Sequence, residues 1–141
     1  MDYSATITVP AGPATAKRAI CDEMHIWWTK RVELDGPIAT VRFNNSHATF
    51  DRGEPVGDTM RWPCLDANMI IEGIPDTTEW TGTSLRWTIK PAGDGSSITL
   101  THAGLNQSLE CLEVCTRGWQ HFFETSLKAH LSGDAPSPET R

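Results

Sequence analysis

The chain begins with a strict alternation of apolar and polar residues, which is the pattern of a strand with one buried face. Within residues 3–9 the apolar side carries Tyr3, Ala5, Ile7 and Val9. Residues 10–13, Pro-Ala-Gly-Pro, then break the alternation, and a proline suits the first position of a helix because its missing N–H needs no partner there. We therefore predict a strand over residues 3–9 and a short helical segment after it.

The middle of the chain repeats short alternating segments that are separated by turn residues. Between residues 34 and 105 these segments each offer one apolar and one polar side, which predicts an antiparallel meander with one covered face. The clearest hairpin joins residues 83–90 to residues 96–103 across Asp94-Gly95. Pro63 and Pro75 cannot donate to a ladder, so we expect them at strand ends, bulges or an edge.

The last periodic segment, residues 107–131, has apolar residues at steps of three and four and predicts a long helix that lies on the sheet. Its stripe consists of Leu112, Cys115, Trp119, Phe122, Phe123, Leu127 and Leu131. Gly118 inside this helix costs ~1 kcal/mol relative to alanine, and we interpret it as a place where the backbone comes close to another element. Gly133 is expected to end the helix, and residues 133–141 are predicted to form a disordered tail because they have nothing to bury. Residues 1–132 are then a single domain.

Charge and composition exclude several classes of protein. The net charge of -6 repels phosphate backbones, so we expect no nucleic-acid partner. The first residues lack the bases and the continuous apolar run of a signal peptide, and no window approaches the length of a membrane span, so we expect a cytoplasmic protein with no membrane span. The four cysteines fit no zinc spacing; Cys111 and Cys115 could share a metal on a helix, but no neighbouring loop offers further ligands, so we predict no metal site.

Segments spread over most of the chain, together with the order of the expected elements, resemble a known superfamily. They are residues 5–10, Trp27-Trp28, residues 82–89, 93–96 and 100–105, Gly118-Trp119 and residues 126–128. The pattern is similar to the START-like (SRPBCC) superfamily, in particular to the branch resembling the C-terminal domain of the activator of heat-shock chaperone ATPase, over roughly residues 3–132. The resemblance implies an α+β helix-grip fold, in which a curved antiparallel sheet of about six or seven strands wraps a long C-terminal helix. It also implies a deep apolar cavity between sheet and helix, which relatives use for hydrophobic small molecules.

Tryptophan is over-used, with six tryptophans against one tyrosine. An aliphatic core needs no indoles, each of which requires an N–H partner, so the excess favours a flat aromatic surface for a ligand. We place Trp119 and Phe122 on the helix side of the cavity, Trp87 on the facing sheet, and Trp27 or Trp28 near the mouth. The alternative is that these aromatic side chains simply fill the core.

His102 is the sharpest polar candidate, because it shares the inward face of its strand with Ile98 and Leu100. It could hydrogen-bond a ligand or titrate near neutral pH; the alternative is a histidine that is hydrogen-bonded to backbone at a strand end. No carboxylate, serine or cysteine at a suitable spacing completes a dyad or triad, so no catalytic residue is assigned. The predicted ligand-binding residues are Trp27, Trp28, Trp87, His102, Trp119 and Phe122.

These observations favour a domain that binds an apolar small molecule, without a cofactor, as a monomer or weak homodimer. One alternative is an enzyme that resembles polyketide cyclases or aromatases, with His102 as general acid or base. The other is a protein-interaction module that resembles the co-chaperone activators, which would expose a contiguous apolar patch around Trp27-Trp28.

Overall fold

A computed structural model describes residues 2–141 and shows one seven-stranded antiparallel sheet over that range. The strand order is β1-β7-β6-β5-β4-β3-β2. The strands are β1 (Tyr3–Val9), β2 (Arg31–Asp35), β3 (Ile38–Phe43), β4 (Ser46–Asp51), β5 (Thr59–Asn68), β6 (Ser84–Ala92) and β7 (Gly95–Ala103). The predicted strand over residues 3–9 and the predicted hairpin are both confirmed, since Trp87 pairs with Leu100 within β6–β7.

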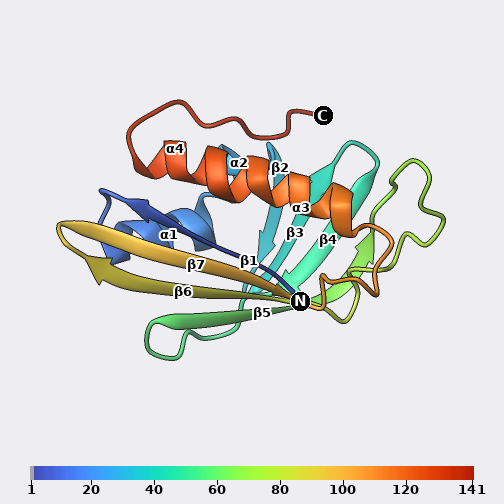
Figure 1. Ribbon diagram of the computed structural model, residues 1–141, viewed down its shortest axis with the longest axis horizontal. Coiled ribbons are helices and arrows are strands. Elements are labelled where there is room, and N and C mark those ends of the chain that lie inside the picture. Colours follow the sequence, from blue (N-terminus) through green and yellow to red (C-terminus); the bar gives the residue numbers. More distant parts are fainter. Residues whose placement is uncertain (1) are drawn as a thin grey trace.

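The helices lie at the start and the end of the chain. They are α1 (Pro13–Asp22), α2 (Met24–Trp27), α3 (Leu112–His121), the π-helical segment η1 (Phe122–Leu127) and α4 (Lys128–Leu131). Elements α3, η1 and α4 form one continuous helix that crosses a face of the curved sheet (Figure 1). This is the helix-grip arrangement, so the predicted fold class is confirmed. Within residues 2–141 no helix has both the length and the apolar composition that crossing a bilayer requires.

Pro63 marks the place where the sheet bends. Strand β5 pairs with β6 from Thr59 to Pro63, which lies opposite Ser84, and with β4 from Cys64 to Asn68. Since proline has no N–H to donate, the ladder can change partners here without losing a hydrogen bond. The expectation that Pro63 marks an irregularity is confirmed, and Pro75 lies outside the strands.

The long helix starts at Leu112 rather than at the predicted Gln107. Turns occupy the residues before it, and the Glu79 carboxylate accepts hydrogen bonds from the backbone N–H groups of Glu110 (2.9 Å) and Cys111 (3.1 Å). The cap therefore comes from a distant loop, which helical periodicity cannot reveal. At the other end Gly133 (φ 81°) ends the helix, and Asp134 N donates to the Ala129 carbonyl, as expected for a glycine C-cap.

The segment after Gly133 differs from the disordered tail that the sequence predicts. It runs back along the long helix (Figure 1), and Glu139 forms a bridge with backbone groups that flank Thr29. Glu139 N donates to the Trp28 carbonyl (2.9 Å), and Lys30 N donates to the Glu139 carbonyl (2.8 Å). Ser137 N is held by the Ser126 hydroxyl (2.8 Å). These contacts are mainly to the tail's backbone, so its polar side chains give no sign of them.

Candidate ligand-binding pocket

The space between the sheet and the long helix is largely filled with aromatic rings. All six tryptophans are buried, and Trp27 and Trp28 are stacked with ring centroids 5.5 Å apart. Trp28 continues to Trp119 (5.1 Å), which stacks on Trp80 (6.0 Å). This row of rings joins α2 to α3 and to the turn that holds Trp80. The rings of Trp27 and Trp87 therefore fill the space in the middle of the core, whereas Trp28, Trp119 and Trp80 border a pocket.

The pocket beside these rings has a volume of about 260 Å³. Its walls come from the first turns of the long helix, from the turn between β3 and β4, and from the loop that follows β5. The residues that line it are Trp28, Phe43, Asn44, Asn45, Ser46, Met69, Ile70, Ile71, Trp80, Val114, Cys115, Gly118, Trp119, Phe122 and Glu139. Further hollows of about 330 and 630 Å³ beside α1 are lined by no aromatic residue. The pocket under α3 is thus the best candidate for binding an apolar ligand.

Three of the six predicted site residues line this pocket, namely Trp28, Trp119 and Phe122. Trp27 and Trp87 lie deeper in the solid part of the core. The Trp27 indole donates to the Ala19 carbonyl (2.8 Å), and the Trp87 ring meets Trp27 edge-on at 6.2 Å. Their inward orientation agrees with the sequence pattern, but neighbouring rings occupy the space in front of them.

His102 is also buried away from the pocket, and both of its ring nitrogens are engaged. Nδ1 accepts a hydrogen bond from Trp119 Nε1 (3.0 Å), so the ring proton is on Nε2, which donates to the Thr83 hydroxyl (2.8 Å). That hydroxyl in turn donates to the Trp80 carbonyl (2.6 Å). Burial lowers the pKa of His102 to about 3, against a weak opposing effect of Asp2. The imidazole is therefore neutral and holds Trp119 in place beside the pocket.

Gly118 has a different role from the one that the sequence predicts. A Cβ added there would meet no atom of another element within 4 Å, so the expected close approach of the helix backbone to another element is wrong. The glycine instead faces the pocket and leaves it open. Its position beside Trp119 in a helix interior is a real signal, because an alanine would favour the helix by ~1 kcal/mol. The glycine in this helix therefore marks the open pocket beside it and not a close contact with another element.

Trp80 and Cys115 also line the pocket although neither was among the predicted site residues. Trp80 lies in a turn between β5 and β6, where no periodicity indicates which way a side chain points. Its indole N–H donates to the Cys115 Sγ at 3.3 Å, which joins this turn to α3. Cys115 belongs to the predicted helical stripe, but its spacing alone cannot separate a core thiol from one at a pocket wall.

The pocket has an apolar and a polar side. Aromatic and aliphatic side chains come from the helix and the row of rings. The polar side consists of Asn44 and Asn45 from the β3–β4 turn, Ser46 at the start of β4, and Glu139 from the tail. The Ser46 hydroxyl accepts a hydrogen bond from Ile70 N (2.8 Å), which fixes the neighbouring loop. Such a pocket suits a ligand with an apolar body and one polar end.

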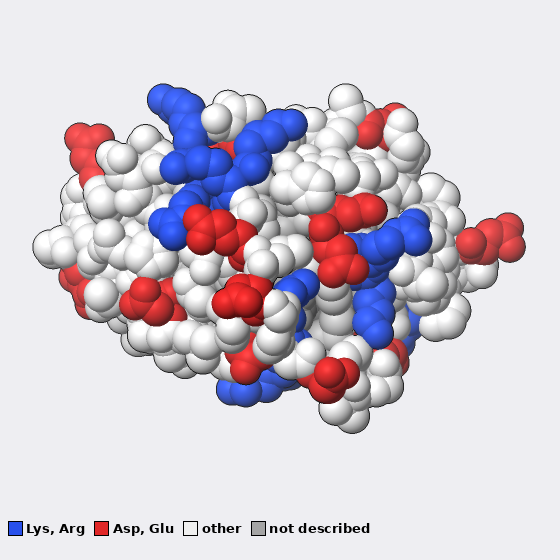
Figure 2. Space-filling view, turned by 180° about the vertical axis from the view of Figure 1, so that it is seen from behind, with Lys and Arg blue, Asp and Glu red and all other residues white. Residues whose placement is uncertain are grey.

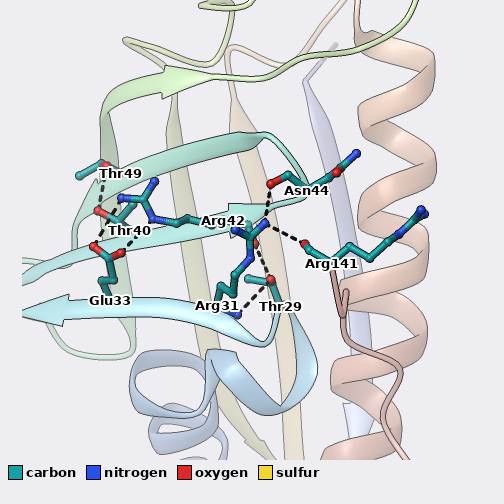
Figure 3. A network of polar contacts seen from close by, with 8 residues as sticks. All are labelled: Thr29, Arg31, Glu33, Thr40, Arg42, Asn44, Thr49 and Arg141. Carbon is teal, nitrogen blue, oxygen red and sulfur yellow. Dashed lines mark hydrogen bonds and ion pairs between the residues drawn. The ribbon is translucent and has the colours of Figure 1, made fainter.

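A network of polar contacts holds the rim of the pocket (Figure 3). The Arg31 guanidinium donates to the carbonyl oxygens of Asn44 and Arg141 (2.9 Å for the latter), and so joins β2 to the β3–β4 turn and to the tail. The buried Thr29 hydroxyl donates to the Arg42 carbonyl. The turn and the tail that form the polar rim are therefore held by the same strand edge.

Comparison with known proteins identifies the fold. The sequence matches no protein-family model and no curated protein. Among solved structures it is similar to the Aha1 dimer from Colwellia psychrerythraea, with a TM-score of 0.73 and 20% identity over 94% of this chain and 96% of that one. It is also similar to CalU16 from Micromonospora echinospora, with a TM-score of 0.62 and 20% identity over 96% of this chain and 76% of that one.

A third similar structure is DynU16, a protein of the dynemicin biosynthetic locus. The TM-score is 0.65 at 15% identity, and the match covers 98% of this chain and 50% of DynU16. At these identities the likeness shows the fold alone. The chain has the helix-grip fold that the resemblance in its sequence implies.

Proposed function

We propose that the protein binds a small apolar molecule, with an aromatic or other flat body and one polar end, in the pocket under α3. The observation that carries this proposal is a pocket of about 260 Å³ with Trp28, Trp80 and Trp119 on its walls and a glycine, Gly118, where the helix would otherwise fill it. This volume is slightly below the usual range for ligand sites, so it fits one or two rings rather than a long lipid.

The expected affinity is modest. A two-ring ligand that buries about 200 Å² of apolar surface gains ~5 kcal/mol from its removal from water. The loss of translational and rotational freedom offsets part of this gain, so dissociation constants of about 1 mM or weaker are expected for simple aromatic probes. A natural ligand with a polar group that matches Asn45 or Glu139 would bind more tightly.

The two alternatives from the sequence have less support. An enzyme with His102 as general acid or base needs a free ring nitrogen near the ligand, but both nitrogens are bonded to protein groups and the ring lies outside the pocket wall. A protein-interaction module needs an exposed patch around Trp27-Trp28, and these residues are only 0% and 1% exposed. Acidic and basic side chains are interspersed on the face seen in Figure 2, which shows no extended area of one sign for a charged macromolecule.

The test is a titration with 2-naphthol followed by the six indole N–H signals in nitrogen–proton NMR spectra. We expect the signals of Trp28, Trp80 and Trp119 to shift, while those of Trp62 and Trp87, which lie away from the pocket, stay in place.

Variants of Gly118 make the test specific. Gly118→Ala should weaken binding and Gly118→Leu should abolish it, because the new side chains occupy the pocket, and urea unfolding verifies that each variant folds. Gln120→Leu adds the same side chain at an exposed position of α3 and serves as the matched control. Unchanged affinity in Gly118→Leu would mean that 2-naphthol binds elsewhere, and the proposal would be rejected.

A further inference from the structure

The Cys115 thiol and the Trp80 indole N–H meet at one wall of the pocket, and a second thiol, Cys111, precedes Cys115 by four residues. Cys115, in the first turns of α3, lines the pocket and is 6% exposed. Cys111 is also buried and lies about one helical turn before Cys115. The Trp80 indole donates a hydrogen bond to Cys115 Sγ at 3.3 Å. An N–H that points at sulfur stabilises the thiolate more than the thiol, because the anion is the better acceptor.

The Cys111 thiol strengthens the same effect. Donation from the Cys111 S–H is the largest cause that lowers the pKa of the Cys115 thiol, and the Trp80 N–H lowers it further. Burial and the negative charge of Glu79 oppose this shift. The other titratable groups around the cluster are Glu139 on the opposite rim and His102, which is neutral and contacts the Trp80 ring. Cys111 is the donor of the pair, and its own pKa is raised.

The remaining cysteines provide a comparison within the same chain. Burial raises the pKa of Cys64 to about 11, and it also raises the pKa of Cys21, which lines a hollow beside α1. Among the titratable thiols of residues 2–141, Cys115 alone has a lowered pKa. The described residues contain no group of histidines, cysteines and carboxylates that could hold a metal ion, so the pair has no evident metal role.

We propose that Cys115 is a nucleophile that captures an electrophilic ligand, specifically an α,β-unsaturated carbonyl compound with an aromatic body, in the pocket under α3. This inference rests on the proposed binding function. Cys115 Sγ attacks the β-carbon, a C–S bond forms, and the electron pair of the C=C bond moves to give an enolate. The enolate then takes up the proton that the thiol has lost. The net reaction adds S–H across the double bond. It releases no leaving group and consumes no oxidant or reductant.

The experiment compares N-phenylmaleimide, which is such an electrophile, with N-phenylsuccinimide, which has nearly the same shape but no double bond. Reaction of the full chain near pH 7 is followed by intact-mass measurement and peptide mapping. We expect Cys115 to be labelled first, about tenfold faster than Cys21, because it combines a thiolate-stabilising site with a bound reagent. Cys115→Ser should remove the fast phase, and Cys21→Ser, the matched control, should leave it unchanged.

Variants of the donors separate activation of the thiol from simple access. Cys111→Ala removes the S–H donor and should slow labelling of Cys115 and move the midpoint of its pH profile upward, whereas Cys111→Ser keeps a donor and should restore both. Trp80→Phe should act in the same direction as Cys111→Ala. Binding of N-phenylsuccinimide, measured for each variant, shows whether the pocket itself is intact.

The two proposals fail in different ways. If N-phenylsuccinimide binds in the pocket but Cys115 reacts no faster than Cys21, the nucleophile is rejected and the binding function stands. If N-phenylsuccinimide does not bind and 2-naphthol does not slow labelling of Cys115, the binding function is rejected as well.

Discussion

The buried tryptophans differ in whether their indole N–H has a partner, and this difference separates residues that look alike in the sequence. Trp119 donates to His102, and Trp27 donates to a backbone carbonyl. The indole N–H groups of Trp62 and Trp87 have no hydrogen-bond partner among residues 2–141. A buried donor without a partner lowers stability, so shape rather than hydrogen bonding accounts for these two indoles.

A pair of matched substitutions tests this distinction. Trp119→Phe leaves His102 Nδ1 without a donor and should lower the free energy of unfolding by about 3–4 kcal/mol. Trp87→Phe removes similar volume but also an unpaired N–H, so the loss should be about 1–2 kcal/mol. Urea unfolding of both variants measures the difference. A larger loss in Trp87→Phe would contradict the hydrogen-bond argument.

The buried neutral His102 makes stability depend on pH. Its pKa in the folded protein, about 3, is below the ordinary value of 6.5, so the unfolded chain binds one more proton between these two values. The contribution of His102 is therefore complete above about pH 6.5 and is lost as the pH falls toward 3, at up to ~1.4 kcal/mol per pH unit. Unfolding free energies measured between pH 7 and pH 4.5 should fall accordingly. In His102→Gln the unfolding free energy should be lower at pH 7 but should fall less steeply toward pH 4.5. Equal slopes in the two proteins would show that other groups cause the pH dependence.

At the scale of the element, the long helix keeps its buried residues facing the sheet along its whole length. Its buried positions recur every four residues: Cys111, Cys115, Trp119, Phe123, Leu127 and Leu131. In a regular α-helix each step of four overshoots a full turn by ~40°, so the two ends of this row would face different directions. The π-helical segment η1 contains an extra residue and winds more slowly, which turns the later positions back toward the sheet.

Deletion of single residues tests this account. Thr125 is exposed and lies within η1, so its deletion should convert η1 to α-helix and cost only about 1 kcal/mol, because the residues on either side keep their orientation. Deletion of the exposed Arg117, within the regular part of α3, rotates one half of the helix by ~100° against the other and should cost several times more or prevent folding. Circular dichroism and urea unfolding compare them, and equal damage from both deletions would refute the role given to η1.

At the scale of the whole molecule, the tail connects the helix, the strand edge and the pocket. Ser126 Oγ donates to the Trp27 carbonyl (2.6 Å) and accepts from Ser137 N, so a single hydroxyl ties α2 to the tail. Glu139 then bridges to the backbone beside Thr29 and lines the pocket. The polar rim of the pocket therefore depends on residues that are far apart in the sequence.

Removal of residues 135–141 should weaken both stability and binding. The loss of the bridging hydrogen bonds should lower the free energy of unfolding by about 1–3 kcal/mol. The affinity for 2-naphthol should fall several-fold, because the pocket loses one wall. Ser126→Ala, which retains the tail but loses its anchor, should show a smaller loss of the same kind. Full affinity in the shortened chain would show that the tail is not part of the site.

The sequence was sufficient to predict most strands and the long helix, because the patterns that indicate them lie within each segment. Alternation over residues 3–9 and 96–103, and helical spacing from Leu112 onward, report which face of each element is buried. The role of Pro63 follows equally from its missing N–H. The cap that Glu79 provides and the position of the tail could not be predicted, because both depend on backbone groups that meet across long stretches of chain.

By itself the sequence determined that aromatic side chains of the strands and of the C-terminal helix turn inward, since periodicity decides which face of an element is buried. It could not determine which of these rings line a hollow. Packing decided that Trp27 and Trp87 fill the core while Trp28 and Trp119 end beside a pocket. The physical reason is that a cavity is a difference between the volume enclosed by all elements and the volume of the side chains within it, and only the assembled tertiary structure fixes both.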